Sequence, residues 1–499
     1  MLTRNLSNLI LRCLIGIALI VLLLPNAMVS MRNTASVKEW GWSSSKYWAI
    51  CAETFRSEGA WLASRSGGKL IPAADVSKAD DIGHNLLSGI ISAVLGRSLV
   101  PPDVARLNVA LCLLGFLVVL YMLMAARFWV AVLLLVLASK WLLPTQFASN
   151  ATSPHASHSG VALLALVLPV VLALRIWTVM PVSLCDAITS PRSLLGRWRW
   201  IFWGLSSASL AVLVRSPFSF MLVFAVVASG LVALWLRSGI RPRSFRASVI
   251  PILVLAISML VVLFIPWTVL RLRDAVWKIE PAVYIETHGT SHNLTIGLGA
   301  VENKLGVTWI DSCGEALAKE VDPQAAYLTP RYYSALWKRY FQFWREQPGE
   351  VARIYLEKSR VILTSVAYGW MPLWVLGLVT VGCVIVSMSR WSVSVARECP
   401  HALVIFSAST MLALFLLQGV CAHPMRQYWL PVESLFVVIV AVSVDLIVRW
   451  ICFAINPEIV GTTRDSDGVV DNFGIVTLKL LAVFCTVYPI VKLWGSVIT

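Results

Sequence analysis

The stretch Ile250–Ile265, which reads IPILVLAISMLVVLFI, decides the fold because it is strongly apolar and carries no charge. Two further runs, Val375–Met388 and Leu435–Val444, are also free of charged residues. Flanking apolar residues extend each run to about 20, the length that a helix needs to cross the hydrocarbon core of a bilayer. Runs of this kind recur along the chain, so the sequence predicts a protein that crosses a membrane several times.

The composition of the whole chain agrees with this prediction. Of its 499 residues, 58% are hydrophobic and 13% are charged, whereas soluble domains carry about 25% charged residues. This balance excludes a secreted enzyme, a cytosolic enzyme and a disordered scaffold. The net charge of +15 does not indicate nucleic-acid binding, because the bases occupy short loops between apolar runs and form no basic stripe interleaved with aromatic residues.

We predict an all-α polytopic membrane protein with about eleven transmembrane helices. The expected spans cover residues 9–29, 105–125, 128–144, 160–177, 201–214, 217–236, 248–270, 361–388, 401–421, 429–448 and 473–494. Arginines collect in the short loops at one side of these spans, and only Arg215 and Arg426 occupy short loops at the other side. The positive-inside bias therefore places the arginine-rich loops in the cytoplasm.

This orientation places two long segments, 30–104 and 271–360, on the non-cytoplasmic side. They divide the chain into an N-terminal membrane module (1–270, which includes the first long loop), a second long loop (271–360) and C-terminal membrane helices (361–499). Apolar spacing in the first long loop predicts amphipathic helices over Ser45–Glu58 and Asp81–Leu95, which we expect along the membrane surface. Gly96 is a typical residue for the end of the second helix.

Acidic and imidazole groups stand together at the start of the second surface helix. Asp80 and Asp81 precede His84 by four and three residues. Adjacent carboxylates near a histidine can hold a metal ion or act as a general base. The alternative is that the aspartates only cap the helix, because Asp favours that position. The two roles are compatible.

The densest polar segment of the chain is Glu286–Leu294, followed by Asp311. His288 and His292 lie four residues apart, with Asn293 next to the second. Histidines at this spacing share one face of a helix and could bind a metal ion or a phosphate. The glycine and threonine content instead favours a loop, which could be an ordinary surface connection.

Cations also occur at the edges of apolar spans, where they need a partner. Arg215 stands between two spans, and Arg426 precedes Tyr428 at the start of another. A lipid phosphate or a neighbouring carboxylate, such as Glu433 for Arg426, would be a suitable partner. His155 and His158 lie in the link between the third and fourth spans, where they are either solvated or part of a site. Cys51 and Cys313 are the cysteines of the two long loops and either pair or remain free.

Several of these segments together resemble the GT-C superfamily of membrane glycosyltransferases. The resemblance is strongest to the bacterial branch near the dolichyl-phosphate-mannose–protein mannosyltransferases. The matching segments follow the family's order: Tyr47–Gly59, Ala105–Asn108, the L-x-R-P-like corner Leu213–Pro217, Pro266–Trp267, and the R-Y-x-x-P-like start Arg426–Pro431; His292–Asp311 resembles a loop of bacterial members. Where the family places an acidic residue about four positions before its tyrosine, this chain has Ser43–Ser45.

The resemblance implies a transferase in the membrane, of the bacterial inner-membrane type, with its active side facing the periplasm or exterior. It would move a sugar from a polyprenyl-phosphate donor to a lipid, glycan or protein acceptor and would have no nucleic-acid partner. Arg215 and Arg426 would contact the phosphate, because guanidinium matches phosphate oxygens at two points. The candidate bases are Glu39, Asp81 and Asp311, and a divalent metal ion remains open as a cofactor.

Two other functions stay open. An O-antigen polymerase or ligase would also need a large outer loop, but it would use a polyprenyl diphosphate. A transporter would place ionisable groups near the membrane midplane. We further predict that His288, His292 and Asp311 share one cavity with Asp81 and His84, with the two long loops closing over it.

Overall fold

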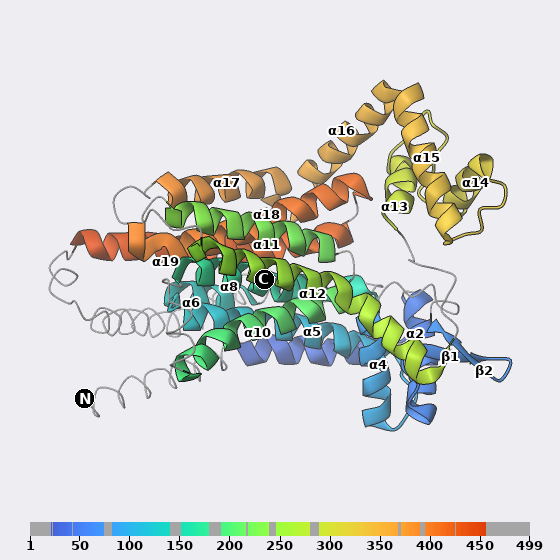
Figure 1. The fold of residues 1–499 in the computed structure, drawn as a ribbon, viewed down its shortest axis with the longest axis horizontal. Coiled ribbons are helices and arrows are strands. Elements are labelled where there is room, and N and C mark those ends of the chain that lie inside the picture. The colour runs from blue at the N-terminus through green and yellow to red at the C-terminus, as the bar shows by residue number, and fades with distance from the viewer. Residues whose placement is uncertain are drawn as a thin grey trace, which may run out of the picture.

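The computed structural model describes residues 21, 23–41, 43–73, 82–139, 151–178, 191–215, 218–238, 246–279, 289–367, 371–389, 395–424 and 426–455. In this part of the chain the fold is mostly helical (Figure 1), as predicted. Two small hairpins are the exceptions, β1 (Ala63–Ser66) with β2 (Lys69–Pro72) and β3 (Val366–Ala367) with β4 (Met371–Pro372).

Within the described residues, six helices are long and apolar enough to cross a membrane. They are α5 (Pro101–Ala125), α8 (His158–Thr178), α11 (Phe218–Ser238), α12 (Arg246–Trp277), α18 (Val395–Cys421) and α19 (Arg426–Ile455). Shorter apolar stretches lie in α10 (Pro191–Val214) and α17 (Leu373–Ser389). The described part therefore belongs to an integral membrane protein. A total of about eleven spans stays a prediction, because 473–494 and most of 9–29 lie outside the described residues.

The predicted span 361–388 is wrong at its start. Helix α16 (Pro348–Thr364) ends there, the hairpin β3–β4 follows, and α17 begins at Leu373. Pro372 precedes this new helix, and the Leu373 N–H donates to the carbonyl of Ser365 at 2.9 Å. A proline has no N–H to continue a helix and fits at a helix start, so the apolar run is split between two elements. Helix α6 (Trp129–Leu137) is likewise shorter than the predicted 128–144, although residues 140–144 lie outside the described part.

Helix α8 forms the centre of the bundle and packs against α5, α10, α11, α18 and α19. Its contact with α5 is closest at two glycines. A Cβ on Gly115 would lie 2.0 Å from the carbonyl oxygen of Gly160, and a Cβ on Gly160 would lie 2.3 Å from the Cα of Cys112. Small residues allow such backbone approach between membrane helices. Helix α12 lies at the edge of the bundle and exposes Leu260, Phe264 and Trp267, as a lipid-facing helix would.

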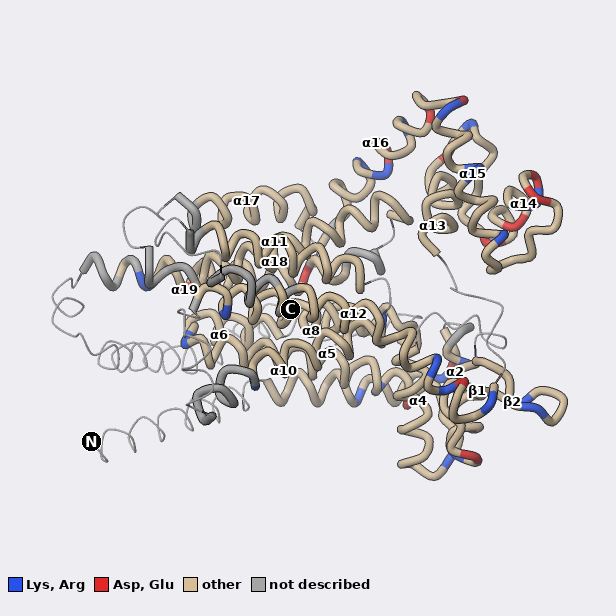
Figure 2. Tube along the Cα trace, in the orientation of Figure 1, with Lys and Arg blue, Asp and Glu red and all other residues tan. Residues whose placement is uncertain are grey.

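Both long segments lie at the same end of the bundle (Figure 1). Helix α5 starts at that end, after α4 (Ile82–Leu95), and finishes at the opposite end. There the carbonyl of Arg127 accepts a hydrogen bond from the Arg449 guanidinium. Figure 2 shows charged residues concentrated at the two ends and few along the bundle. The two long segments thus lie at one end of the bundle, as predicted, and Arg127 and Arg449 lie at the other.

The first long segment contains the two predicted helices, α2 (Ser43–Glu58) and α4, which pack against each other. Gly96 follows α4 with φ +65°, as expected for a helix end. The buried face of α4 carries small and polar residues such as Ser88 and Ser92, while Val94 is 81% exposed. Ile90, Val94 and Leu95 thus face outward, whereas Leu87 and Ile91 pack against the bundle. Its location on the membrane surface stays a prediction.

The second long segment folds into a lobe of four helices. They are α13 (Thr290–Gly297), α14 (Asp311–Val321), α15 (Pro330–Glu346) and α16, with the short η3 (Leu298–Ala300) after α13. Their core includes Tyr332, Leu336, Val351 and Ile354, all fully or nearly fully buried. The segment expected as a loop is therefore helical over Thr290–Gly297, where Leu294 packs against this core and Ile296 is buried.

One buried lysine ties this lobe to the membrane bundle. The Lys358 Nζ of α16 donates to the carbonyls of Gly297, Cys421 and Ala422 at 3.0, 3.0 and 2.8 Å. Its three N–H donors thus meet the ends of α13 and α18. A Cβ on Gly297 would lie 2.6 Å from the Ala422 oxygen, so the two backbones are in direct contact. His423 packs against Trp309 beside this junction, and burial lowers its pKa to about 4.

Candidate functional site

A cluster of buried polar side chains lies where α2, α4, α5, α8 and α10 meet, at the end of the bundle that carries the long segments. We name it the His84 cluster. Each described member is at most 9% exposed. The members are Ser45, His84, Asn108, Thr152, Ser153, His155, Ser157, His158 and Arg215. Polar groups buried at this density need hydrogen bonds or a ligand, so the cluster is the main candidate site.

Asn108 organises the cluster from the second turn of α5. Its Nδ2 donates to the carbonyls of Ala151 and Ser153, both at 2.9 Å. These two bonds fix the orientation of the amide, so that Oδ1 must accept a bond. The Nε2 of His84 lies 3.1 Å from this oxygen. Asn108 thereby holds both the link before α8 and the ring of His84.

The ring of His84 is held at both of its nitrogens and on one face. Its Nε2 faces the Asn108 oxygen, and its Nδ1 lies 3.3 Å from the carbonyl oxygen of Val214. The Ser157 hydroxyl, 3.3 Å from Nε2, donates to the carbonyl of Pro154 and so can accept from the ring. Oxygen atoms thus lie within hydrogen-bond reach of both ring nitrogens. Trp48 stacks on the ring, with the two ring centroids 5.1 Å apart.

Arg215, His155 and His158 form the part of the cluster nearest the bundle. Arg215 directly follows α10 and is 9% exposed, and it lies within electrostatic range of His155 together with His84. His155 and His158 contact each other, with ring nitrogens 3.2 Å apart. His158 also packs against Phe218 at the start of α11. The cluster thus combines a guanidinium with three imidazoles.

The local sequence explains why these groups converge. A Cβ on Gly83 would lie 2.6 Å from the backbone of Leu213 and Val214, so only glycine lets the first turn of α4 touch the last turn of α10. Three helices begin at the cluster: α4 with His84 in its first turn, α8 at His158, and α11 after Arg215. Helix N-termini carry partial positive charge and free N–H groups, which adds to the positive character of the site.

The second predicted group lies in the outer lobe and has a different environment. The Nδ1 of His292 lies 2.5 Å from the Tyr332 hydroxyl, and its Nε2 lies 3.5 Å from a carboxylate oxygen of Asp311. His292 and Tyr332 are fully buried, while the Asp311 side chain is 49% exposed. Burial and the nearby Asp311 carboxylate raise the pKa of Tyr332, so its hydroxyl keeps its proton. This group belongs to the aromatic core of the lobe.

The structure therefore brings some predicted residues together and separates others. Arg215 and His84 share one cluster, and His292 and Asp311 share another, with Asn293 half-buried beside them. Figure 1 places α4 and α13 in separate parts of this end of the molecule. Glu39 is exposed. Asp80, Asp81 and His288 lie outside the described residues, as do the side chains of Arg426 and Tyr428. The common cavity stays a prediction, because Asp81 and His288 lie outside the described residues.

Two further expectations have structural outcomes. Cys51 and Cys313 are free thiols, and burial raises the pKa of Cys51 to about 11. Among the described residues, no group of three or more Asp, Glu, His and Cys side chains is arranged to hold a metal ion.

Sequence reasoning gave too little weight to Asn108, His155 and His158. In the sequence, Asn108 is only part of a segment that resembles the GT-C superfamily, and the two histidines are part of a short polar link. Their common signal is a polar residue directly beside an apolar span, the same signal that identified Arg215. Their partners are distant in sequence, so spacing along the chain did not reveal the cluster.

At the opposite end of the bundle, a buried charge has a complete set of partners. Asp445 accepts from the N–H groups of Val130 and Ala131 at 2.8 and 3.3 Å. It also contacts His401 at 2.9 Å and Arg449 at 2.7 Å. These bonds cap the start of α6 and hold α18 and α19 together. This ion group is structural.

Comparisons with known proteins give one match. No protein-family model matches the chain, and no curated protein sequence matches it. Among solved structures, the crystal structure of ArnT from Cupriavidus metallidurans in the apo state is similar over 90% of this chain and 81% of that chain. The two chains are 14% identical and the TM-score is 0.30. A likeness this low assigns neither a family nor an activity.

Proposed function

We propose that this chain is a membrane glycosyltransferase of the GT-C type, which transfers a sugar from a polyprenyl-phosphate donor to an acceptor on the non-cytoplasmic face of a bacterial inner membrane. The observation that carries the proposal is the His84 cluster. It gathers a guanidinium and three imidazoles, all buried, where membrane helices begin. The phosphate of a lipid whose tail lies in the bilayer would reach the level of this cluster.

The roles follow from charge. During transfer, an acceptor hydroxyl oxygen forms a bond to the anomeric carbon while the bond from that carbon to the phosphate oxygen breaks. The phosphate keeps the electron pair and gains negative charge. Arg215 and His84 would stabilise that charge, since preorganised donors aimed at developing charge lower a barrier. His155 and His158 would complete the phosphate contacts, and Arg426 with Tyr428 is proposed to lie on the lipid side.

The hydroxyl proton needs a base in this mechanism. Asp80 and Asp81 directly precede α4 in sequence, and α4 starts at the His84 cluster; we therefore propose one of them as the base. That aspartate would take the role of the acidic residue that the resembling family has where this chain has Ser43–Ser45. Glu39 is exposed and Asp311 lies beside His292, so both are weaker candidates. His292, Asn293 and His288 would then act in the outer lobe, as substrate contacts or as supports of its core.

A donor screen with the purified full chain in nanodiscs tests this proposal. Polyprenyl monophosphates carrying different radiolabelled sugars are supplied with a membrane extract as the source of acceptor, and the release of polyprenyl phosphate and the labelled product are measured. We expect release from at least one monophosphate donor. Release only from polyprenyl diphosphate donors would favour a polymerase or ligase. Release from none of the donors would contradict a transferase.

A further inference from the structure

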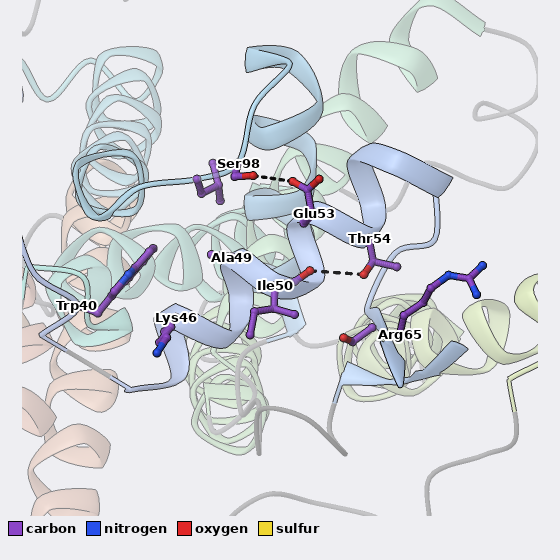
Figure 3. A pocket seen from close by; sticks show the side chains of 10 residues that line it. Trp40, Lys46, Ala49, Ile50, Glu53, Thr54, Arg65 and Ser98 are labelled. Carbon is purple, nitrogen blue, oxygen red and sulfur yellow. Dashed lines mark hydrogen bonds between the residues drawn. The ribbon is translucent and has the colours of Figure 1, made fainter. Parts of the chain in front are cut away.

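An open groove lies on the face of α2 that points away from the His84 cluster. It has a volume of about 450 Å³, within the range of small-molecule sites. Figure 3 shows Trp40 at one end and Arg65 at the other, with side chains of α2 between them. The α2 side chains that line it include Lys46, Ala49 and Glu53, which recur at helical spacing and so share one face of the helix.

The opposite face of α2 belongs to the His84 cluster. Ser45 donates to the carbonyl of Thr152 at 2.9 Å, and Trp48 stacks on His84. Neighbours in sequence thus serve the two sites, because Ser45 faces the cluster and Lys46 faces the groove. A helix with its side chains is about 10–12 Å across. A ligand in the groove would lie one helix diameter from the cluster and could reach it past the first turn of α2.

The lining of the groove selects a type of ligand. Trp40 is half-buried and offers part of a flat apolar ring. Polar groups line the groove farther along α2: the Glu53 carboxylate, which accepts from Ser98 at 2.8 Å, and the Thr54 hydroxyl. Sugar rings present C–H groups on their faces and hydroxyls at their rims, so they match an aromatic ring bordered by donors and acceptors.

The charges of the groove add a second requirement. Glu53 is paired with Arg56, and Arg65 is paired with Glu58 at 2.5 Å. Lys46 is exposed and forms no ion pair within the part of the chain that the structure describes. The groove therefore has one uncompensated positive charge, that of Lys46, at the end of α2 nearest the His84 cluster.

We infer that this groove binds an anionic glycan, the acceptor, with a sugar ring on Trp40 and a negative group at Lys46. The role of the glycan as the acceptor rests on the proposed function, whereas its binding to the groove does not. The acceptor hydroxyl would approach the donor over the first turn of α2, and its negative charge would be held away from the phosphate by Lys46.

Binding is tested with two probes that differ only in charge, digalacturonate and its neutral counterpart galactobiose. Saturation-transfer NMR is recorded with the full chain in nanodiscs. We expect digalacturonate to bind more tightly, and Lys46→Gln to remove this preference, a change of up to about fivefold for an exposed charge pair. Trp40→Ala should weaken both probes, and Ala49→Trp should abolish binding of both by filling the groove.

Ala93→Trp is the matched control, since it makes the same exchange at an exposed position of α4 that does not line the groove. Equal binding by wild type, Trp40→Ala and Ala49→Trp, or no binding to the wild type, would overturn the inference. Donor turnover separates the two proposals. Release of polyprenyl phosphate without groove binding rejects the groove alone, and groove binding without release from any donor rejects the transferase and leaves an anionic-glycan site.

Discussion

The two histidine groups at the same end of the molecule differ in what surrounds them. His84 has acceptors at both ring nitrogens, an indole stacked on its face and Arg215 in the same cluster. His292 has a tyrosine hydroxyl at one nitrogen and a distant carboxylate at the other, inside an aromatic core. The first environment collects positive charge where membrane helices begin, whereas the second fixes a helix within a lobe.

The comparison shows that polar density in a sequence does not identify a site. The segment around His292 is the richest in polar residues, yet its histidine packs as a core residue. The His84 cluster draws its residues from the first long segment, from α5 and α8, from the end of α10 and from the short link before α8. We therefore assign chemistry to the His84 cluster and support to the His292 group, and the following variants test that division.

The largest effect is expected at Arg215. Arg215→Ala removes the guanidinium from the cluster, and sugar transfer should fall about 10²–10³-fold, the scale for loss of one group that stabilises transition-state charge. Arg215→Lys should recover part of the rate, because lysine supplies the charge without the two-point geometry. Rates are compared at equal amounts of folded protein. Full activity of Arg215→Ala would remove the phosphate role from this residue.

Lys358→Met should be the most destabilising change in the outer lobe. It removes three hydrogen bonds and leaves three carbonyls without their donor, a loss of about 2–3 kcal/mol in the free energy of unfolding. Urea unfolding in detergent measures the change. Lys319→Met is the control, since its ion pair with Glu315 is exposed and worth less than about 1 kcal/mol. Equal effects of the two variants would show that Lys358 does not anchor the lobe.

Asn108→Asp should raise the KM for the donor about tenfold or more, through the charge it adds next to His84. The new carboxylate would repel the donor phosphate, and it would also lose the two bonds that the Asn108 amide donates to the carbonyls of Ala151 and Ser153. Steady-state kinetics with the donor varied measure the effect. An unchanged KM together with a lowered kcat would indicate that Asn108 supports the fold of the site only.

Tyr332→Phe probes the other histidine. It removes the hydroxyl that bonds to His292, and we expect a loss of about 1 kcal/mol in stability with transfer almost unchanged. A thermal unfolding curve and a transfer assay on the same sample give both values. A large loss of transfer without loss of stability would move the chemistry into the outer lobe.

The smallest effect concerns pH. Burial holds the pKa of His423 near 4 in the folded protein, below the ordinary value of about 6.5. The unfolded chain therefore binds more protons at this site between these values, so stability should fall as the pH is lowered from 6.5 toward 4. Unfolding measured at pH 7 and at pH 5 should show a smaller difference in His423→Phe. An identical difference would contradict a buried His423.

Much of the fold follows from the sequence, for reasons visible in particular residues. The uncharged run predicts α12, because a membrane span requires consecutive apolar residues. The spacing of apolar residues predicts α2 and α4, because an amphipathic helix repeats them at helical intervals. The hairpin at Ala63–Pro72 was missed, although Gly67 and Gly68, both with positive φ, are typical of a two-residue turn. Lys358 could not be found, since in sequence it looks like any base of a charged helix.

The candidate site was only partly predictable for a related reason. Arg215 stood out because a cation between apolar spans is costly without a partner. Asn108, His155 and His158 acquire meaning only when α5, α8 and α4 meet, and Gly83 is what permits that contact. Such long-range packing is not expressed in the spacing of a single segment.

The most direct test of the central claim is the affinity of the chain for polyprenyl phosphate alone. Native mass spectrometry, in detergent, compares the wild type with Arg215→Ala and Tyr332→Phe. If the His84 cluster holds the phosphate, the wild type and Tyr332→Phe bind equally, and Arg215→Ala binds at least about tenfold more weakly, as expected for a lost charge-assisted contact. Equal binding by all three proteins, or a loss confined to Tyr332→Phe, would contradict the account.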